Sequence, residues 1–193
     1  MYLAQACQKN NCALIYISSD QVFSGLHAPY DENQLPHPIN WYGISKLWGE
    51  KAARINQNTC VVRTNFLSTE GGFFQWVKTN LEAGKTIQGY TDIFFNPLDA
   101  DFLSDCLQHL INLHNRPQLL HLSARDCISK GACIQKIAQL MGKENQVELC
   151  SAPIDYQKAK RPKNMSLRSS IIAQLTSFPP MPSMNEVMGR LLA

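Results

Sequence analysis

The sequence has few of the features that mark membrane, secreted or nucleic-acid-binding proteins. It contains no run of about 18 apolar residues, the length a membrane-spanning helix needs, and its opening segment, MYLAQACQKNN, lacks the charged and apolar regions of a signal peptide. The net charge of +3 is small and scattered, so we predict neither a nucleic-acid partner nor binding to a membrane. The 193 residues, 45% of them hydrophobic, suffice for a core.

No CxxC pair occurs among the seven cysteines, and their odd number does not suit a disulfide framework. Several lie inside apolar runs, where a thiol behaves as a small hydrophobic group. This pattern is typical of a reducing compartment, so we expect a cytoplasmic location. We predict no metal site.

Short apolar, β-branched runs alternate with helical patterns along the chain. The chain begins with a helical pattern that stops at Asn10 and Asn11, and Ser129 and Gly142 are a candidate N-cap and C-cap. Strand, long loop, helix and strand form a crossover unit, which predicts a parallel sheet and an α/β fold. We expect strands at 13–18, 60–64 and 119–123, and helices at about 42–56, 72–83, 99–113 and 129–141.

The tail from Pro153 to Pro182 is rich in proline and basic residues, which predicts an irregular lobe. A local cluster of charge is either a solvated basic face or an anion site for a phosphorylated ligand. The cluster consists of Lys158, Lys160, Arg161, Lys163 and Arg168.

Tyr42 and Lys46 are four residues apart at the start of a predicted helix, so both side chains can address one ligand. A tyrosine beside a cation can pass a proton to a carbonyl oxygen, while the lysine has donors free for a ribose hydroxyl. Ser19 follows a predicted strand, where ligands of parallel sheets bind, and its hydroxyl can polarise the same carbonyl. The alternative is that Ser19 satisfies a turn.

The string IYISSDQVFSGLHAPYDENQLPHPINWYGISKLWGE, at 15–50, closely resembles the dTDP-4-dehydrorhamnose reductase family of extended short-chain dehydrogenases/reductases. The resemblance continues through Arg63-Thr64, the helix near Asp99, and Arg161-Pro162-Lys163-Asn164. It implies the C-terminal portion of a Rossmann-like, doubly wound parallel sheet with a smaller substrate-binding lobe. Residues 1–150 would form the partial catalytic domain, and 151–193 the lobe, interwoven with 65–100.

The resemblance also implies a function: reduction of a nucleotide-linked 4-keto-6-deoxy sugar with NADPH or NADH, as in dTDP-rhamnose biosynthesis. It assigns catalytic roles to Ser19, Tyr42 and Lys46. By the same match, substrate contacts fall to Asp20, Phe66, Arg161 and Asn164, and cofactor contacts to Ser18, Tyr42, Lys46 and Arg63.

Two residues depart from the family pattern. Gln21 stands where related sugar-nucleotide dehydratases carry a glutamate, and because an amide cannot ionise, dehydration is disfavoured. Phe66 stands where the reductases usually have tryptophan, so an altered sugar pocket is expected.

The family opens with a glycine-rich turn that holds the cofactor pyrophosphate, and no such turn precedes Met1. The expected missing part is on the order of 90 residues, so the chain is either a fragment or a shortened protein. We therefore expect an incomplete NADP or NAD site, very weak cofactor binding and no turnover by the isolated chain. The uncovered edge of strand 13–18 invites association, including a homo-oligomer.

Two other functions remain open. One is a non-catalytic regulatory or sugar-nucleotide-binding subunit, because the methionine adenosyltransferase regulatory subunit shares the SSD, YxxxK and R-P-x-N patterns. The other is a sugar-nucleotide epimerase of the same superfamily. An inactive remnant is a further alternative.

Overall fold

The computed structural model describes residues 1–153, 160–175 and 177–192. At its centre lies a three-stranded parallel sheet, in the order β1-β2-β7. Tyr16 of β1 stands opposite Val61, and Arg63 of β2 opposite His121. All of β2 is buried, as its apolar sequence predicts. The three strands are β1 (Leu14–Ile17), β2 (Thr59–Thr64) and β7 (Leu119–Leu122).

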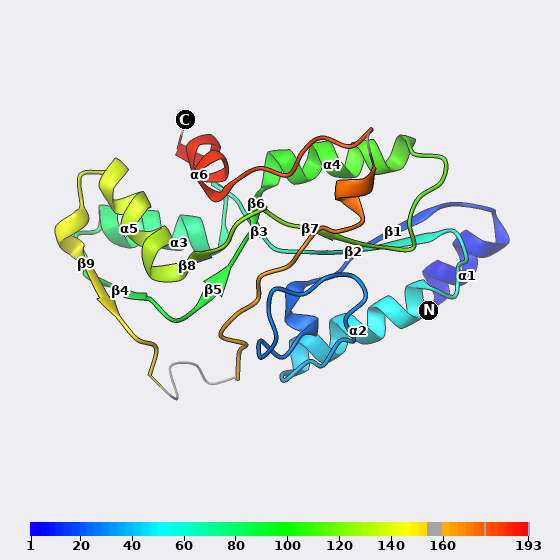
Figure 1. Ribbon diagram of the computed structural model, residues 1–193, viewed down its shortest axis with the longest axis horizontal. Coiled ribbons are helices and arrows are strands. Elements are labelled where there is room, and N and C mark those ends of the chain that lie inside the picture. Colours follow the sequence, from blue (N-terminus) through cyan, green and yellow to red (C-terminus); the bar gives the residue numbers. More distant parts are fainter. Residues whose placement is uncertain (154–159, 176, 193) are drawn as a thin grey trace.

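Helices cover both faces of this sheet, α2 (Trp41–Ala53) on one side and α4 (Ala100–Asn112) on the other (Figure 1). The preceding side chains fix where these helices start. The side chain of Asn40 accepts from the Gly43 amide, and that of Asp99 accepts from the Phe102 amide. The predicted parallel sheet is confirmed, and the predicted strands and long helices agree with the structure to within about three residues. Helix α1 (Tyr2–Lys9) ends at Asn10.

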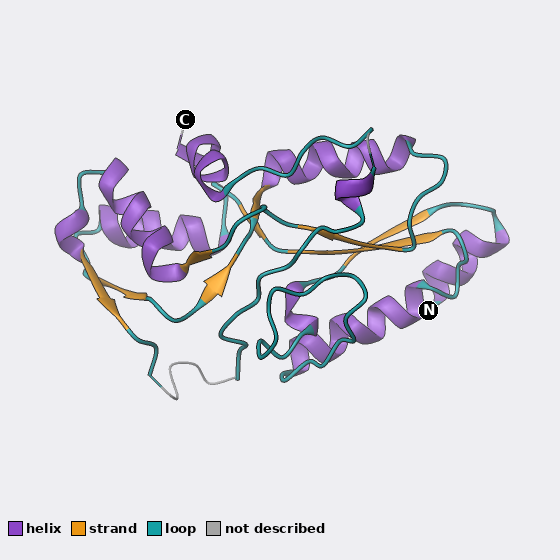
Figure 2. Cartoon of the chain, viewed as in Figure 1, coloured by secondary structure: helices purple, strands orange, loops and turns teal. Residues whose placement is uncertain are grey.

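A second lobe lies beside the sheet and combines helices with short strand pairs (Figure 2). Strands β4 and β9 pair in parallel, and β5 and β8 antiparallel. Strand β3 (Phe66–Leu67) follows directly on β2 and pairs in parallel with β6 (Leu98–Asp99), which directly precedes α4. The lobe contains α3 (Gly72–Glu82), β4 (Ile87–Tyr90), β5 (Phe94–Phe95), β8 (Ile128–Ser129), α5 (Lys130–Leu140), η2 (Glu144–Gln146), β9 (Val147–Cys150) and α6 (Met184–Leu192).

Buried side chains form three clusters, and the C-terminal segment reaches all of them. Leu167 packs with the loop after β1, Ile172 and Phe178 pack under the sheet and α4, and Val187 packs in the second lobe. The predicted irregular tail is confirmed over its described part, where the one regular element is the short turn η3 (Ile172–Gln174). The division into units 1–150 and 151–193 stays a prediction.

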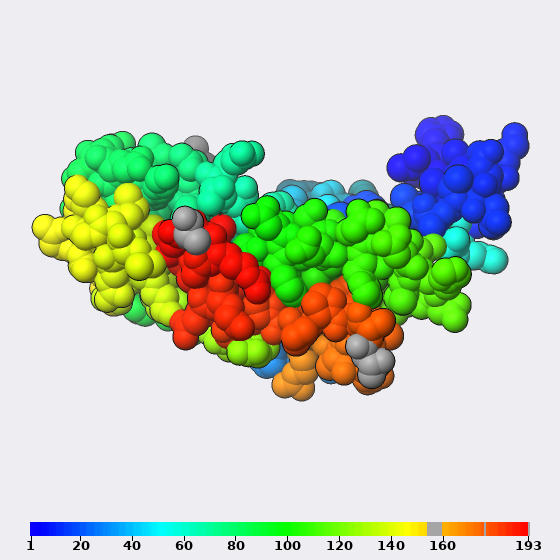
Figure 3. All heavy atoms as spheres, turned by 90° about the horizontal axis from the view of Figure 1, so that it is seen from above, coloured from blue at the N-terminus to red at the C-terminus, as the bar shows by residue number. Residues whose placement is uncertain are grey.

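Strand β1 lies at the edge of the described sheet and pairs with β2 alone. The association predicted from that edge is untested. Space-filling spheres show α1 as a projection at one end of the molecule (Figure 3). None of the described helices is long and apolar enough to span a membrane. All seven cysteines are unpaired.

Candidate active site

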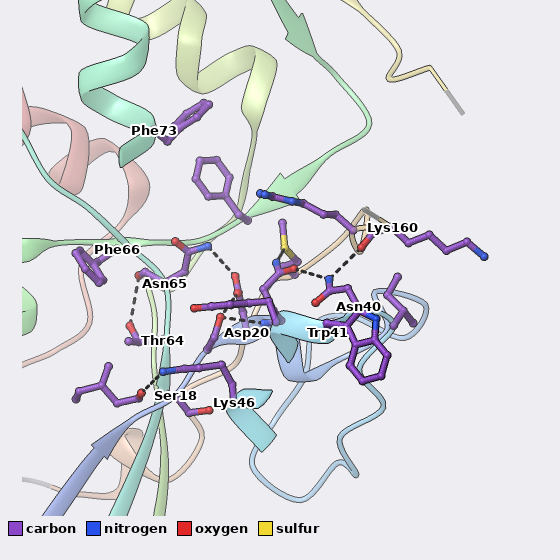
Figure 4. A pocket seen from close by; sticks show the side chains of 18 of the residues that line it. Ser18, Asp20, Asn40, Trp41, Lys46, Thr64, Asn65, Phe66, Phe73 and Lys160 are labelled. Carbon is purple, nitrogen blue, oxygen red and sulfur yellow. Dashed lines mark hydrogen bonds between the residues drawn. The ribbon is translucent and has the colours of Figure 1, made fainter. Parts of the chain in front are cut away.

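A cavity of about 760 Å³, here called the central cavity, lies beyond the carboxyl ends of β1 and β2, where the sheet meets the second lobe. Figure 4 shows its lining, with Asp20 and Asn65 in the middle, Thr64 and Phe66 to one side, and Asn40 and Lys160 to the other. Its position agrees with the rule that parallel sheets bind ligands at this edge.

Ser19 both caps a turn and lines the central cavity. Its hydroxyl accepts from the Gln21 amide at 3.2 Å and donates to Asp20 Oδ1 at 3.0 Å. Ser19 can therefore both satisfy the turn and contact a ligand in the cavity. The short turn that it caps is η1 (Asp20–Val22).

The carboxylate of Asp20 is buried beneath the cavity, and Asn65 Nδ2 donates to its Oδ2 at 2.7 Å. Burial raises the pKa of Asp20, while hydrogen bonds from Asn65, Ser19 and Gln21 act in the opposite direction. Asp20 is thus a polar group that the structure holds in one orientation.

Tyr42 and Lys46 line the same cavity from the first turns of α2. Tyr42 is 56% exposed, so a ligand in the cavity can reach its side chain. Lys46 Nζ donates to the Ile17 carbonyl at 2.7 Å and lies 5.1 Å from the centroid of the Tyr16 ring. An ammonium group has three N–H donors, so two remain for a ligand. The structure thus brings Ser19, Tyr42 and Lys46 to one cavity.

Arg63 has a different environment from the one predicted for a cofactor contact. It is buried in an ion pair with Glu50, with Nε 2.9 Å from Oε1 and an Nη 2.8 Å from Oε2. Ser18, which does line the cavity, donates its hydroxyl to the same carboxylate at 2.5 Å. The Arg63 guanidinium is thus used inside the fold, and Arg63 is not among the residues that line the central cavity. Its contact with a cofactor stays a prediction.

The predicted basic cluster is divided between several environments. Arg161 and Lys160 line the central cavity. Lys163 forms an ion pair with Asp92 at 2.6 Å, and Asn164 accepts from the Ser166 amide and hydroxyl. Asn164 and Arg168 line a separate third cavity of about 900 Å³. Lys158 lies outside the described residues. Asn164 therefore lines a different cavity from Arg161, and its contact with a substrate stays a prediction.

Both residues that depart from the family pattern line the central cavity. Phe66 is half exposed. The Gln21 amide contacts Met165 Sδ and accepts from Asn40 Nδ2 at 3.3 Å. Gln21 therefore fastens η1 to its neighbours and offers no ionisable group.

Sequence reasoning missed several lining residues because they come from the second lobe. Phe73, Phe95 and Lys130 belong to α3, β5 and α5. A second cavity of about 730 Å³ shares Phe73, Lys130 and Arg161 with the central one, and Trp76, Asn80, Lys85 and Tyr90 also line it. The sequence did contain one indication that Lys130 has a special role. This lysine directly follows the helix cap Ser129, where the helix dipole disfavours a positive charge.

Comparison with known proteins shows which family the chain resembles in sequence and in fold. The family model described as the RmlD substrate binding domain matches residues 1–192. A probable low-salt glycan biosynthesis reductase of Haloferax volcanii is 29% identical over 175 residues, covering 86% of this chain and 58% of that protein. Methionine adenosyltransferase 2 subunit beta of Xenopus laevis is 45% identical over 62 residues, covering 32% of this chain and 19% of that protein.

Among solved structures, dTDP-4-dehydrorhamnose reductase from Bacillus anthracis in complex with NADP superimposes with a TM-score of 0.90. It is 27% identical, and the match covers 98% of this chain and 68% of that one. The chain spans less than two thirds of the length of the Haloferax volcanii and Xenopus laevis proteins.

Proposed function

Since the chain belongs to the RmlD substrate binding domain family, we propose that it supplies the catalytic and sugar-binding residues of a nicotinamide-dependent reductase acting on a nucleotide-linked 4-keto-6-deoxy sugar. The observation that carries this proposal is that Ser19, Tyr42 and Lys46 line one cavity. A reductase of this kind needs a proton donor, a group that polarises the carbonyl, and a cation beside the cofactor ribose.

Each residue has a role that its contacts allow. In the free protein the Ser19 hydroxyl donates to Asp20 Oδ1; with substrate bound it turns this hydrogen to the carbonyl oxygen, and Tyr42 delivers a proton to that oxygen. Bound NADPH or NADH supplies the hydride that adds to the carbonyl carbon. Lys46, held at the Ile17 carbonyl, uses its remaining donors on a ribose hydroxyl. Proton and hydride together convert the ketone to an alcohol.

The remaining polar groups fit a sugar linked to a nucleoside diphosphate. The Asp20 carboxylate can accept from a sugar hydroxyl, and Phe66 provides an apolar surface for the ring. Arg161 offers planar donors that suit a phosphate. Gln21 offers no acid or base for the loss of water, which favours reduction over dehydration. The seven unpaired cysteines support a cytoplasmic location.

Replacement of Tyr42 by phenylalanine tests the proposal. We expect turnover of dTDP-4-keto sugars to fall about 10²- to 10⁴-fold because the proton donor is lost, while binding of the sugar nucleotide is kept. The measurement is NADPH or NADH oxidation by the full-length protein, with the exposed Tyr2 of α1 as the control position for the same change. Equal activity of Tyr42→Phe and Tyr2→Phe would sink the proposal.

A second candidate function rests on the likeness to methionine adenosyltransferase 2 subunit beta. In that case the chain binds a methionine adenosyltransferase and reduces no sugar. Co-purification with a methionine adenosyltransferase catalytic subunit, together with absence of turnover for a panel of dTDP-4-keto sugars, would favour this alternative.

A further inference from the structure

Lys130 stands at the wall between the central cavity and the second cavity and lines both. Its ammonium lies 5.0 Å from the centroid of the Phe73 ring and 5.8 Å from that of Phe95, so the two rings support its side chain. Arg161 also lines both cavities. Two cations thus stand where the two spaces meet.

Neither cation has a carboxylate partner among the described residues, whose ion pairs all involve other side chains. Burial lowers the pKa of Lys130, the nearby charge of Arg161 lowers it further, and Asp20 acts in the opposite direction. The free protein therefore keeps a half-buried positive charge near a second one. A bound anion would relieve both the burial cost and the repulsion.

The backbone holds Lys130 in this position. Its amide donates to the Ile93 carbonyl at 2.8 Å. A Cβ atom on the next residue, Gly131, would lie 2.8 Å from the Gly89 carbonyl oxygen, so α5 packs directly on β4. A lysine in the first turn of a helix is opposed by the helix dipole, and the first turn of α5 has no acidic residue to offset it. The stability of the helix itself does not explain a lysine here.

We propose that Lys130 and Arg161 together bind the diphosphate that joins the two halves of the ligand, so that Lys130 selects nucleoside-diphosphate sugars over free sugars. This inference rests on the proposed function, because it names the linking group of the same substrate. Two cavities that share a cationic wall suit two bulky groups joined by an anion. A diphosphate also matches two cations, whereas a single carboxylate neutralises one.

The test is calorimetric titration of the 193-residue chain with dTDP, with thymidine and with inorganic pyrophosphate. We expect Lys130→Met to weaken binding of dTDP at least about tenfold and to leave thymidine unchanged, because a charge-assisted hydrogen bond is lost. Lys130→Arg should keep most of the affinity. Lys136→Met is the matched control, because Lys136 lies on the same helix and contacts Asn185 on the exposed surface.

Each outcome decides the question. Loss of dTDP and pyrophosphate affinity in Lys130→Met alone supports the inference. Equal dTDP affinity in Lys130→Met and Lys136→Met overturns it, and so does failure of the native chain to bind dTDP. The readout needs no turnover, so Lys130-dependent binding without sugar reduction by the full-length protein would refute the proposed function and leave the anion site standing.

Discussion

Glu50 joins the helix that carries Tyr42 and Lys46 to the central strand. Glu50 is 2% exposed, and its carboxylate accepts hydrogen bonds from Arg63 and Ser18. In Glu50→Gln the Arg63 guanidinium would stay buried without a counter-charge. We therefore expect the free energy of unfolding to fall by about 3–5 kcal/mol in urea unfolding experiments.

The control for this change is Glu82→Gln. Glu82 pairs with Lys78 at 4.0 Å on the surface of α3, with both side chains about half exposed. Such pairs contribute about 0.5 kcal/mol or less. Similar small losses for both variants would show that the buried pair does not hold α2 to the sheet.

His121 should make the protein sensitive to mild acid. It is fully buried beside Phe23, and burial, followed by the charge of Arg63, lowers its pKa from 6.5 to about 4. In the unfolded chain the His121 imidazole is protonated as the pH falls through 6.5, whereas in the folded chain it stays neutral down to about pH 4. The stabilisation is therefore present above pH 6.5 and is lost as the pH falls below it.

Between pH 7 and pH 5 this group alone should lower the free energy of unfolding by about 2 kcal/mol. Urea unfolding at several pH values, in the native protein and in His121→Gln, measures the difference in slope. The same pH dependence in both proteins would contradict the assignment.

At the residue scale, the sequence predicted the residues that a local rule connects. The four-residue spacing of Tyr42 and Lys46 on a helix is such a rule, and Ser19 follows from the end of a strand. Arg63 belongs to the same motif pattern, but it is 13 positions from Glu50 in the sequence, and no local spacing rule predicts an ion pair at that separation. Lys130 comes to the cavity through tertiary packing that no local spacing encodes.

Among the elements, α2 depends on close approach to the turn η1. A Cβ atom on Gly43 would lie 2.1 Å from the Gln21 carbonyl oxygen and 2.9 Å from Pro38 Cβ. Gly43→Ala must therefore push the start of α2 away from η1. We expect this change to cost about 1–3 kcal/mol of stability and to lower affinity for dTDP, because both elements line the cavity.

Gly189→Ala provides the comparison, because a Cβ atom there meets nothing within 4 Å and the residue lies inside α6. Alanine favours the helix over glycine, so we expect a gain of about 0.5–1 kcal/mol. Thermal unfolding of both variants measures the two effects. If Gly43→Ala proved more stable than the native protein, η1 would have moved to admit the methyl group without loss of stability, which would contradict the prediction.

Long elements were predictable because several turns or a buried apolar run repeat one pattern. Helix α4 and strand β2 are examples, and their predicted limits differ from the observed ones by about one residue. The two-residue strands β3, β5, β6 and β8 are too short to show any period. They form because neighbouring chain segments offer hydrogen-bond partners, which is a property of the tertiary structure.

At the scale of the whole molecule, the C-terminal segment connects the three hydrophobic clusters because it packs into each of them. Its composition predicted an irregular course, but its path past the loop after β1, the sheet and the second lobe depends on contacts between residues far apart in sequence. Because one segment contributes to every core, we expect the two halves of the molecule to unfold in a single cooperative transition.

The tryptophans allow this last prediction to be measured in each half. Trp41 and Trp48 lie on α2 beside the sheet, and Trp76 lies on α3 in the second lobe. In Trp76→Phe the fluorescence reports the sheet half, and in Trp41→Phe/Trp48→Phe it reports the lobe. Adding Val187→Ala, which leaves a gap in the lobe core where Val187 is fully buried, should cost about 2 kcal/mol. Both probes should then move to lower denaturant by the same amount, whereas a shift seen by Trp76 alone would show that the lobe unfolds independently of the sheet.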